Sequence, residues 1–281
     1  MLKLRDMDFL QVKPGKKLKL KEIPSDSTKR LPDRDKADEA TEECTLKMGE
    51  LQDRLYAEGR RSLLVVLQGM DASGKDGTVR KVFDDVNPTG VQVISFKQPT
   101  SEELRHDFLW RCHAKTPPRG HIGVFNRSYY EDVLVVRVHQ DQLLAPELRG
   151  KNGEWKRRYG MICEFERLLG DAGTRVVKFF LHISKKEQRE RFIARQKDPV
   201  KHWKLAAGDF EERKFWDDYQ AAYEDMLPAT AREDSPWYII PADYKWVRNY
   251  WVANIIAATL QEMDPRPPVL TDKSLITKRF K

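Results

Sequence analysis

The segment 69–77, GMDASGKDG, has a glycine, four further residues, and then Gly74 and Lys75. This is the spacing of a phosphate-binding loop, in which backbone N–H groups surround a phosphate and the lysine ammonium reaches it. In such loops the next residue is a serine or threonine whose hydroxyl holds magnesium, but here it is Asp76. Asp71 places a second carboxylate inside the loop. The chemistry indicated is phosphate binding, and the two negative charges beside the anion need an explanation.

The sequence around the loop supports this interpretation. By chance alone, roughly 1 chain in 12 of this length would contain the spacing at ordinary glycine and lysine frequencies. Here a short apolar and β-branched run, SLLVVLQ (62–68), precedes the loop directly and is typical of a parallel strand buried on both faces. A helix is expected to begin near Lys75, so the loop has the strand and helix that aim its N–H groups at an anion. The predicted phosphate-binding residues are Gly69, Ala72, Ser73, Gly74, Lys75, Asp76 and Gly77.

The two carboxylates lead to different predictions. Asp71 is a loop carboxylate that would repel bound phosphates unless divalent cations lie between them, so we predict that it ligates magnesium directly or through water. Asp76 would lie in the first turn of a helix, where the macrodipole favours a negative charge. Its role therefore stays open between metal ligand and helix stabilisation.

The predicted third strand (121–126) ends in Asn126, where P-loop enzymes usually supply an acidic metal ligand. Because an amide carries no charge, compensation of the metal charge would shift towards Asp71 and towards Glu131 or Asp132. Asn126 itself is kept as a predicted metal ligand together with Asp71 and Asp76.

Basic side chains occur at two further places. Arg127 follows Asn126 and is predicted to stabilise charge on the transferred phosphoryl group, against the alternative of a surface ion pair. Residues 185–204 carry eight basic and three acidic side chains, a net charge of +5. Such runs are usually solvated helix faces, but in a P-loop kinase a basic helix after the fourth strand forms a lid over the phosphates. We predict a lid over about 185–207, with Arg191 catalytic and with phosphate contacts from Arg195, Lys197, Lys201 and Lys204.

An acceptor nucleotide is expected beside the segment SFKQPTSEEL (95–104), because it follows the second strand. Lys97 and Thr100 are the candidates there, and Glu131, Asp132 and Arg137 complete the predicted nucleotide-binding set. The six histidines show no metal-ligand spacing and are expected to be structural or exposed. The tryptophans are expected mostly in the core.

Strands and helices alternate along the chain. Strands are predicted at 62–68, 91–96, 121–126, 175–183 and 237–241, and helices at 35–59, 78–86, 101–114, 129–140, 154–170, 184–196, 209–227 and 243–263. Helix-length connections between strands argue for a doubly wound parallel sheet in an α/β fold. We predict an extended arm over 1–34, one domain over 35–265 and a tail over 266–281.

Composition narrows the class of protein without choosing a ligand. The formal charge is +7, from 51 basic and 44 acidic residues, which favours an anionic partner such as nucleic acid, a membrane surface or a phosphorylated small molecule. No apolar run approaches the roughly 18 residues that cross a bilayer. The three cysteines are odd in number and widely spaced, and the N-terminus lacks a signal-peptide pattern. We therefore expect a cytoplasmic protein without a disulfide framework.

Five segments together, GMDASGKDG, SFKQPTSEELRHDFLWR, FNRSYYEDVLVVRVH, HISKKEQRERF and PWYIIPADYKWVRNYWV, resemble the family-2 polyphosphate kinases in order and spacing. The resemblance spans about residues 9–265. It implies a three-layer P-loop kinase core related to thymidylate kinase, with a basic helical lid. The implied reaction is reversible, in-line transfer of a terminal phosphoryl group between polyphosphate and a nucleotide, without phosphohistidine. It requires magnesium, with manganese as an alternative. By motif, Asp71, Lys75 and Asp76 fall in the Walker A element, Arg127 in Walker B and Arg191 in the lid.

One departure points to a branch of that family. Many members have Phe-Asp-Arg-Ser-Trp-Tyr-Asn where this chain has FNRSYYE at 125–131, which puts the metal role of the aspartate in doubt. The form with Asn126 and Glu131 resembles class III, which implies that AMP and ADP are both acceptors, that guanine nucleotides are further candidates, and that the protein is a homo-oligomer such as a tetramer. Nucleic acid and membrane are not implied as partners. The alternatives are an ATP-dependent nucleoside monophosphate kinase and a non-enzymatic nucleic-acid-binding protein.

Overall fold

The computed structural model describes residues 2–149 and 153–276. Its centre is a five-stranded sheet in the order β2-β3-β1-β4-β5. All neighbouring strands are parallel, as predicted. The strands are β1 (Ser62–Gln68), β2 (Val91–Ser95), β3 (Ile122–Asn126), β4 (Thr174–His182) and β5 (Trp237–Pro241). Because β1 has β3 on one side and β4 on the other, the connections diverge at β1, and ligands bind beyond the carboxyl ends of strands at such a point.

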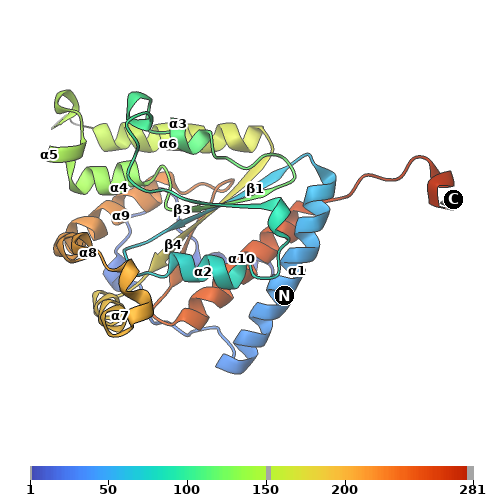
Figure 1. Cartoon of the computed structure of the whole chain (residues 1–281), viewed down its shortest axis with the longest axis horizontal. Helices are drawn as coiled ribbons and strands as arrows, with labels where there is room; N and C mark the ends of the chain where they lie inside the picture. The colour runs from blue at the N-terminus through green and yellow to red at the C-terminus, as the bar shows by residue number, and fades with distance from the viewer. Residues whose placement is uncertain (1, 150–152, 277–281) are drawn as a thin grey trace.

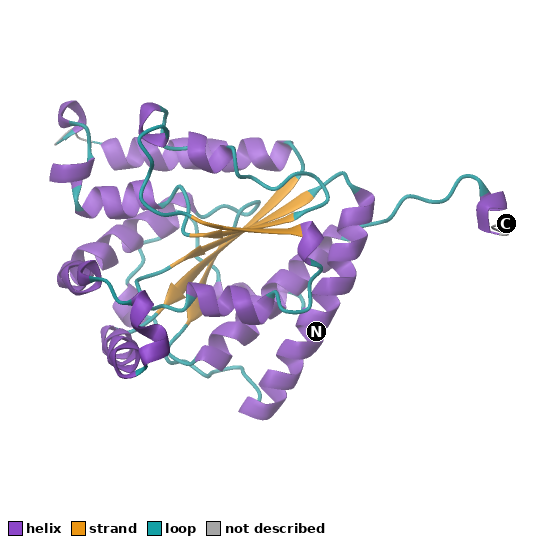
Figure 2. Ribbon diagram, in the orientation of Figure 1, coloured by secondary structure: helices purple, strands orange, loops and turns teal. Residues whose placement is uncertain are grey.

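Helices cover both faces of the sheet and make a three-layer α/β fold (Figures 1 and 2). One face carries α1 (Arg34–Glu58), α2 (Lys75–Val82) and α10 (Lys245–Met263). The other carries α3 (Trp110–His113), α4 (Glu131–Val138), α6 (Glu154–Asp171) and α9 (Trp216–Thr230), with α5 (Gln140–Leu143) beyond α4. Finally, α7 (Lys185–Lys197) and α8 (Ala207–Glu212) lie beside the carboxyl ends of the strands.

Strand β1 illustrates why the sheet is buried on both faces. All seven of its residues are buried. Leu63, Val65 and Leu67 contribute to the apolar core under α1 and α10, whereas Leu64 and Val66 contribute to the core under α6 and α9. Successive side chains of a strand alternate between faces, so a continuous apolar run serves both cores. The strand thereby fixes the position at which the phosphate loop leaves the sheet.

The N-terminal segment predicted as an extended arm packs along β5. It contains two 3-10 helices, Leu4–Leu10 and Leu20–Glu22, and Met7 and Leu20 are almost fully buried. The backbone N–H of Val12 donates to the carbonyl of Trp237, and Gln11 forms an antiparallel bridge with Tyr238. The arm thus covers the outer edge of the sheet. At the other end the tail leaves the body, and residues 277–281 of the predicted tail lie outside the described residues.

The helix predicted over 101–114 was wrong in extent. The structure has a 3-10 turn, Glu103–Arg105, followed by the short α3. Thr100 and Glu103 exchange side-chain-to-backbone hydrogen bonds, and the Asp107 carboxylate accepts from the N–H of Leu109. The reciprocal bonds of Thr100 and Glu103 form a capping box, which favours the start of a helix. The Asp107 bond is a local turn, which competes with a continuous helix before α3 begins. The segment is consequently a turn and a short helix joined by a loop. Within residues 2–149 and 153–276, no helix combines the length and apolarity needed to span a membrane.

Candidate active site

The loop after β1 has the predicted strand, loop and helix arrangement. Gly74 caps the start of α2 with a φ of 102°, a left-handed conformation that suits glycine. Ala72 and Arg127 also adopt positive φ values, 62° and 64°, which is uncommon for residues with a Cβ. Backbone strain of this kind gathers at functional sites. Both strained residues lie at the carboxyl ends of neighbouring strands, β1 and β3.

A cavity of about 700 Å³ opens between the loop, the ends of β2 and β3, and the lid segment. Its predicted lining residues are Asp71, Ala72, Gly74, Lys75, Asp76, Gly77, Lys97, Asn126, Arg127, Arg195 and Lys204. Ser95, Phe96, Gln98, Trp203 and Asp209 complete the lining. The fold therefore brings together residues that are more than 100 positions apart in the sequence.

A larger cavity, about 970 Å³, lies between the N-terminal arm, α7 and α9. Its charged lining consists of three lysines and six carboxylates: Lys19, Lys21, Lys186, Asp26, Glu187, Glu190, Asp217, Glu224 and Asp243. An excess of negative charge repels a polyanion. The smaller cavity at the loop is therefore the better phosphate site.

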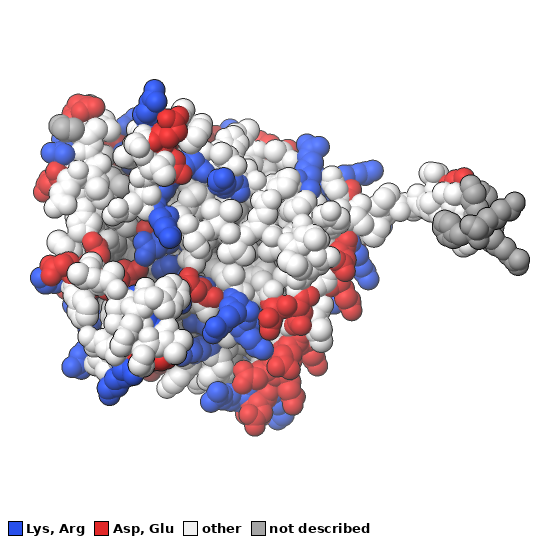
Figure 3. Space-filling model, in the orientation of Figure 1, with Lys and Arg blue, Asp and Glu red and all other residues white. Residues whose placement is uncertain are grey.

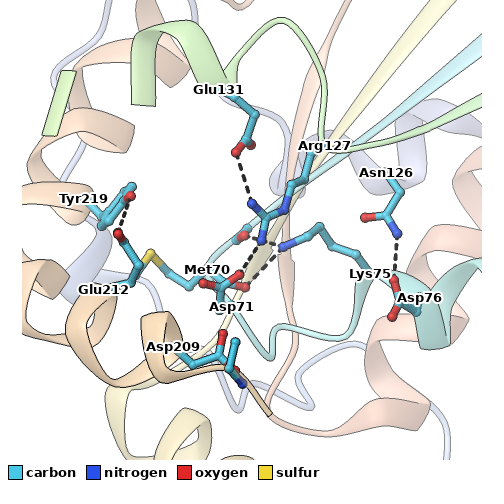
Figure 4. A network of polar contacts seen from close by, with 12 residues as sticks. Met70, Asp71, Lys75, Asp76, Asn126, Arg127, Glu131, Asp209, Glu212 and Tyr219 are labelled. Atoms are coloured by element: carbon cyan, nitrogen blue, oxygen red, sulfur yellow. Dashed lines mark hydrogen bonds and ion pairs between the residues drawn. The ribbon is translucent and has the colours of Figure 1, made fainter. Parts of the chain in front are cut away.

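Lys75 is held inside the loop. Its side chain is 8% exposed, and its Nζ donates to the carbonyls of Gly69 at 2.7 Å and Met70 at 3.4 Å. Burial, with a smaller contribution from Arg127, lowers the pKa of Lys75 to about 8. Figure 4 shows the Lys75 and Arg127 side chains converging on Asp71. An arriving phosphate would meet two adjacent cations and would raise this pKa again.

Arg127 bridges two carboxylates. Its Nη2 lies 2.6 Å from Asp71 Oδ1, and its Nη1 lies 3.5 Å from Glu131 Oε2. Burial opposes the charged form, but Glu131 and Asp71 keep the pKa of Arg127 above its ordinary value. The ion pair considered as the alternative role of Arg127 is thus present inside the site. The ion pairs orient the guanidinium at the cavity wall. A bound phosphoryl group could replace either carboxylate as the partner of Arg127.

Asp76 is tied to Asn126 and to the lid. Its Oδ1 accepts from Asn126 Nδ2 at 2.7 Å, and its Oδ2 lies 3.3 Å from Lys204 Nζ. Burial would raise its pKa, but the hydrogen bonds from Asn126 and Lys204, together with the charges of Lys204 and Lys75, hold the pKa of Asp76 below its ordinary value. Lys204 ends the 3-10 helix Pro199–Lys204 that follows α7. The contact therefore connects the lid to the first turn of α2.

The lid residues divide into two groups. Arg195 and Lys204 line the cavity, whereas Lys197 and Lys201 do not, and Lys201 pairs with Asp198 at 2.5 Å. The segment begins as predicted, because the Ser184 side chain accepts from the N–H of Glu187 at the start of α7. Exposed lid lysines outside the lining could still steer an anion towards the site.

Arg191 contacts the loop from behind and does not line the cavity. Its Nε donates to Glu187, and its two terminal nitrogens donate at 2.6–3.0 Å to four backbone carbonyls, those of Ala72, Ser73, Ala242 and Asp243. All five donors of the guanidinium are used in this way. The predicted catalytic contact of Arg191 with substrate is not supported by this position. Arg191 instead fastens the phosphate loop to the loop after β5.

The nucleotide-binding predictions also divide. Lys97 lines the cavity, and Glu131 is joined to it through Arg127. Three other predicted residues are engaged elsewhere: Thr100 accepts from the N–H of Glu103, Arg137 binds Tyr159 and Asp225, and Asp132 faces Arg158. Burial raises the pKa of Asp132 to about 6. Their positions do not support direct contact with a nucleotide in this cavity.

Trp203 and Arg248 are among the residues at the site that the sequence did not predict. Trp203 was expected in the core, but its side chain is 78% exposed at the rim of the cavity. Arg248, on α10, is 3% exposed and approaches the loop at Gly74. A signal for Trp203 was available, because it stands within the strongly basic lid segment. For Arg248, the sequence shows an arginine within the apolar pattern of α10, which indicates a buried charge. The pattern does not indicate which residues the guanidinium contacts.

The carboxylates fit a metal that is shared with phosphates. Within the part of the chain that the structure describes, no three His, Cys, Asp or Glu side chains form a protein-only metal site. Asp71, Asp76 and the Asn126 amide nevertheless face one cavity with Lys75. Magnesium at phosphoryl-transfer sites is held by one or two carboxylates together with substrate phosphates and water. This donor set meets that requirement.

The distribution of surface charge is consistent with a positively charged approach for an anionic substrate. Figure 3 shows Asp and Glu side chains gathered over α1, whereas Lys and Arg side chains gather over α2 and around α7. The basic elements are those that border the loop. A polyanion approaching this side meets a favourable field before it reaches the cavity.

Comparisons with known proteins agree with the site. The family described as Polyphosphate kinase 2 (PPK2) matches residues 31–268. The chain is 47% identical over 274 residues, which are 96% of this chain and 100% of the relative, to an AMP/ADP-polyphosphate phosphotransferase of Meiothermus ruber. It is 50% identical over 231 residues, 80% of this chain and 79% of the relative, to an ADP-polyphosphate phosphotransferase of Rhodopseudomonas palustris. The crystal structure of polyphosphate kinase 2 from Arthrobacter aurescens TC1 matches with a TM-score of 0.88 and 37% identity, covering 97% of this chain and 96% of that one.

Proposed function

The chain belongs to the polyphosphate kinase 2 family, and we propose that it transfers the terminal phosphoryl group of inorganic polyphosphate to AMP and ADP. The predictions of the family, the P-loop kinase-like fold and the phosphotransferase activity are confirmed by these similarities. The choice of both AMP and ADP as acceptors rests on the names of the relatives and on the Asn126 and Glu131 pattern.

One observation carries the proposal: a single cavity joins the N-terminus of α2 to cations from four separate elements. Lys75 comes from the loop, Lys97 from the end of β2, Arg127 from the end of β3, and Arg195 and Lys204 from the lid. A linear polyphosphate carries about one charge per phosphate and must be held in line with a second phosphate. Cations from separate elements around one cavity would allow both anions to be bound at once.

The chain's own residues account for positioning and charge compensation. Backbone N–H groups at the start of α2 and the Lys75 ammonium would bind the donor phosphates. Arg127, already at the cavity wall, would stabilise the charge on the transferred group. No histidine is among the residues that line this cavity, which supports direct in-line transfer without a phosphohistidine. Proton transfer is not required of the acceptor phosphate, so positioning dominates.

Asp71 and Asp76, with the Asn126 amide oxygen, would hold a divalent metal at the cavity. Kinases typically need such a metal, and here we propose magnesium, with manganese as an alternative. Bound there, the metal would neutralise phosphate oxygens and let two anions approach each other. The carboxylates inside the phosphate loop would then serve the cation and would no longer face the anion alone.

The proposal also covers the oligomeric state, the location and the further substrates and partners of the protein. We propose a homo-oligomer, such as a tetramer, located in the cytoplasm, with guanine nucleotides as further candidate substrates and without nucleic-acid or membrane partners. Size-exclusion chromatography with light scattering would measure the oligomeric state. A nucleotide panel would rank the bases.

The deciding experiment supplies purified protein with AMP or ADP, magnesium and long-chain polyphosphate, without any other phosphoryl donor. ADP and ATP are expected to form. If neither product forms, the proposed function is wrong. Replacing polyphosphate with ATP in the AMP reaction tests the alternative of an ordinary nucleoside monophosphate kinase. Salt-sensitive RNA binding that survives Lys75→Ala would instead favour the nucleic-acid alternative.

A further inference from the structure

Arg248 is a buried cation that has no acidic partner in the part of the chain that the structure describes. Its side chain lies within α10 and is 3% exposed. Nε and Nη2 donate to Asn249 Oδ1 at 3.2 and 2.8 Å, and Nη1 lies 3.5 Å from the Ser73 carbonyl. Within residues 2–149 and 153–276, no carboxylate forms an ion pair with it. A buried charge of this kind is unfavourable unless something compensates it.

The guanidinium presses against the start of α2, directly behind the phosphate loop. A Cβ built on Gly74 would lie 1.9 Å from Nη1, and one built on Gly77 would lie 3.4 Å from Nη2. The N-terminus of a helix carries a partial positive charge. Arg248 therefore adds a full positive charge where the helix already has part of one.

A second guanidinium packs on the same loop. Arg191 donates to the carbonyls of Ala72 and Ser73, and a Cβ on Gly74 would lie 3.4 Å from its Nη1. Glu187 compensates Arg191 at 2.8 Å, but among the described residues no carboxylate compensates Arg248 in the same way. Burial, followed by repulsion from Arg191, lowers the pKa of Arg248 to about 9. With Lys75 and Arg127, four basic side chains surround one short loop.

We infer that Arg248 is a positioning residue whose charge is compensated by the phosphate bound in front of the loop. It does not line the cavity and acts through the loop backbone and through its field. This inference rests on the proposed function only in that the loop binds a phosphate chain. It implies that the ligand-free protein carries a destabilising charge, and that anion binding relieves it.

Two variants test this in different ways. Arg248→Met removes the charge and keeps the length of the side chain. Asn249→Asp leaves Arg248 in place but gives it a carboxylate at the atom that already accepts from Nε and Nη2. The inference predicts the same outcome for both variants: the melting temperature without ligand is higher, and tripolyphosphate binds about tenfold more weakly, on the scale of one screened charge interaction. Arg248→Lys should restore most of the affinity.

The measurements are the melting temperature with and without tripolyphosphate, and tripolyphosphate affinity by calorimetry. Gln261→Glu, an exposed position on the same helix, is the control for the change in net charge. A structural role alone predicts that Arg248→Met melts earlier while the folded protein binds tripolyphosphate normally. If Arg248→Met fails to fold, Asn249→Asp decides, since unchanged stability and affinity in that variant would overturn the inference.

These readouts are separate from turnover. A wild-type protein that binds tripolyphosphate but makes no ADP or ATP would refute the proposed function and leave this inference standing. A wild-type protein that turns over normally, with Asn249→Asp equal to it in tripolyphosphate affinity and stability, would refute the inference alone.

Discussion

The Asn126 amide donates to the Asp76 carboxylate across the opening of the phosphate loop, with 2.7 Å between Nδ2 and Oδ1. The residue at the end of β3 is thus neutral where an acidic one is usual, and its partner in the first turn of α2 is acidic where a hydroxyl is usual. The carboxylate has moved from one strand end to the adjacent helix. This relationship accounts for both departures in the sequence at once.

Asn126→Asp should replace that hydrogen bond with two facing carboxylates. Like charges at this distance raise one pKa and destabilise the metal-free protein by about 1–2 kcal/mol. Magnesium should recover the loss, so the magnesium-induced rise in melting temperature should exceed that of the wild type. Asn126→Ala, which removes the bond without adding charge, is the matched control. Equal magnesium responses in the wild type and in Asn126→Asp would argue against a metal at Asp76.

The lowered pKa of Lys75 predicts that binding of the phosphate donor weakens at high pH. With a pKa of about 8 in the free protein, its charge is lost as pH rises above that value. We expect kcat/KM for polyphosphate to fall about tenfold per pH unit above about 8, while kcat at saturation persists to higher pH because bound phosphate raises the pKa. Initial rates at varied polyphosphate concentration and pH give both profiles. A flat kcat/KM up to pH 10 would contradict the assignment.

The lowered pKa of Lys75 also affects the stability of the fold, which should rise with pH where kcat/KM falls. Because the pKa of Lys75 is lowered from 10.5 to about 8 on folding, the unfolded chain binds this proton more tightly between those values. This group therefore destabilises the fold below about pH 8, and the loss disappears as pH rises to about 10.5. Lys75→Met should flatten that part of the stability profile, measured by denaturant unfolding at each pH.

Arg191 and Arg195 should behave differently although they lie four residues apart on α7. Arg191→Ala removes five hydrogen bonds, four of them to backbone carbonyls, and should destabilise the fold by about 3 kcal/mol while also impairing turnover. Arg195→Ala should raise the KM for polyphosphate and change stability by no more than about 0.5 kcal/mol. Urea unfolding and steady-state kinetics on both variants make the comparison. Equal stability losses would remove the distinction drawn between them.

Trp203 is expected to contact the nucleobase. It is 78% exposed at the cavity rim, so its removal should change stability by no more than about 0.5 kcal/mol. Base stacking on an aromatic ring is worth about 1–3 kcal/mol, so Trp203→Ala should raise the KM for AMP and ADP about tenfold and spare that for polyphosphate. Trp203→Phe should retain most of the affinity. Val200→Ala, 80% exposed on the same 3-10 helix, is the control.

Local sequence predicted the phosphate loop well because everything that defines it is contiguous. The buried run 62–68, the Gly74 cap and the start of α2 follow each other along the chain, and the alternation of strands and helices determined the sheet. The sequence did not predict contacts between segments that are far apart in the chain. The basic pattern of α7 placed Arg191 on a helix face, but only the fold shows that this face meets the loop backbone.

Other misses have similar causes. Residues 101–114 have helical composition, yet the helix ends after one turn, and the Asp107 carboxylate accepts from the N–H of Leu109 in a local turn that competes with its continuation. Arg248 lies more than 170 positions after Gly74, so no spacing rule could join them. The arm over 1–34 lacks a period because its contacts lie with β5, at the far end of the sequence.

That arm also determines which side of the sheet can meet another molecule. Val12 and Gln11 occupy part of the outer side of β5, whereas β2, at the opposite side, is largely solvent-exposed and presents Val93 to water. The free side of an edge strand is a template for pairing with a second chain. A shortened protein that begins at Arg34 would retain every residue of the phosphate site and yet uncover β5. Its weakness would therefore be self-association during folding and storage, with the chemistry of the site intact in the molecules that stay monodisperse.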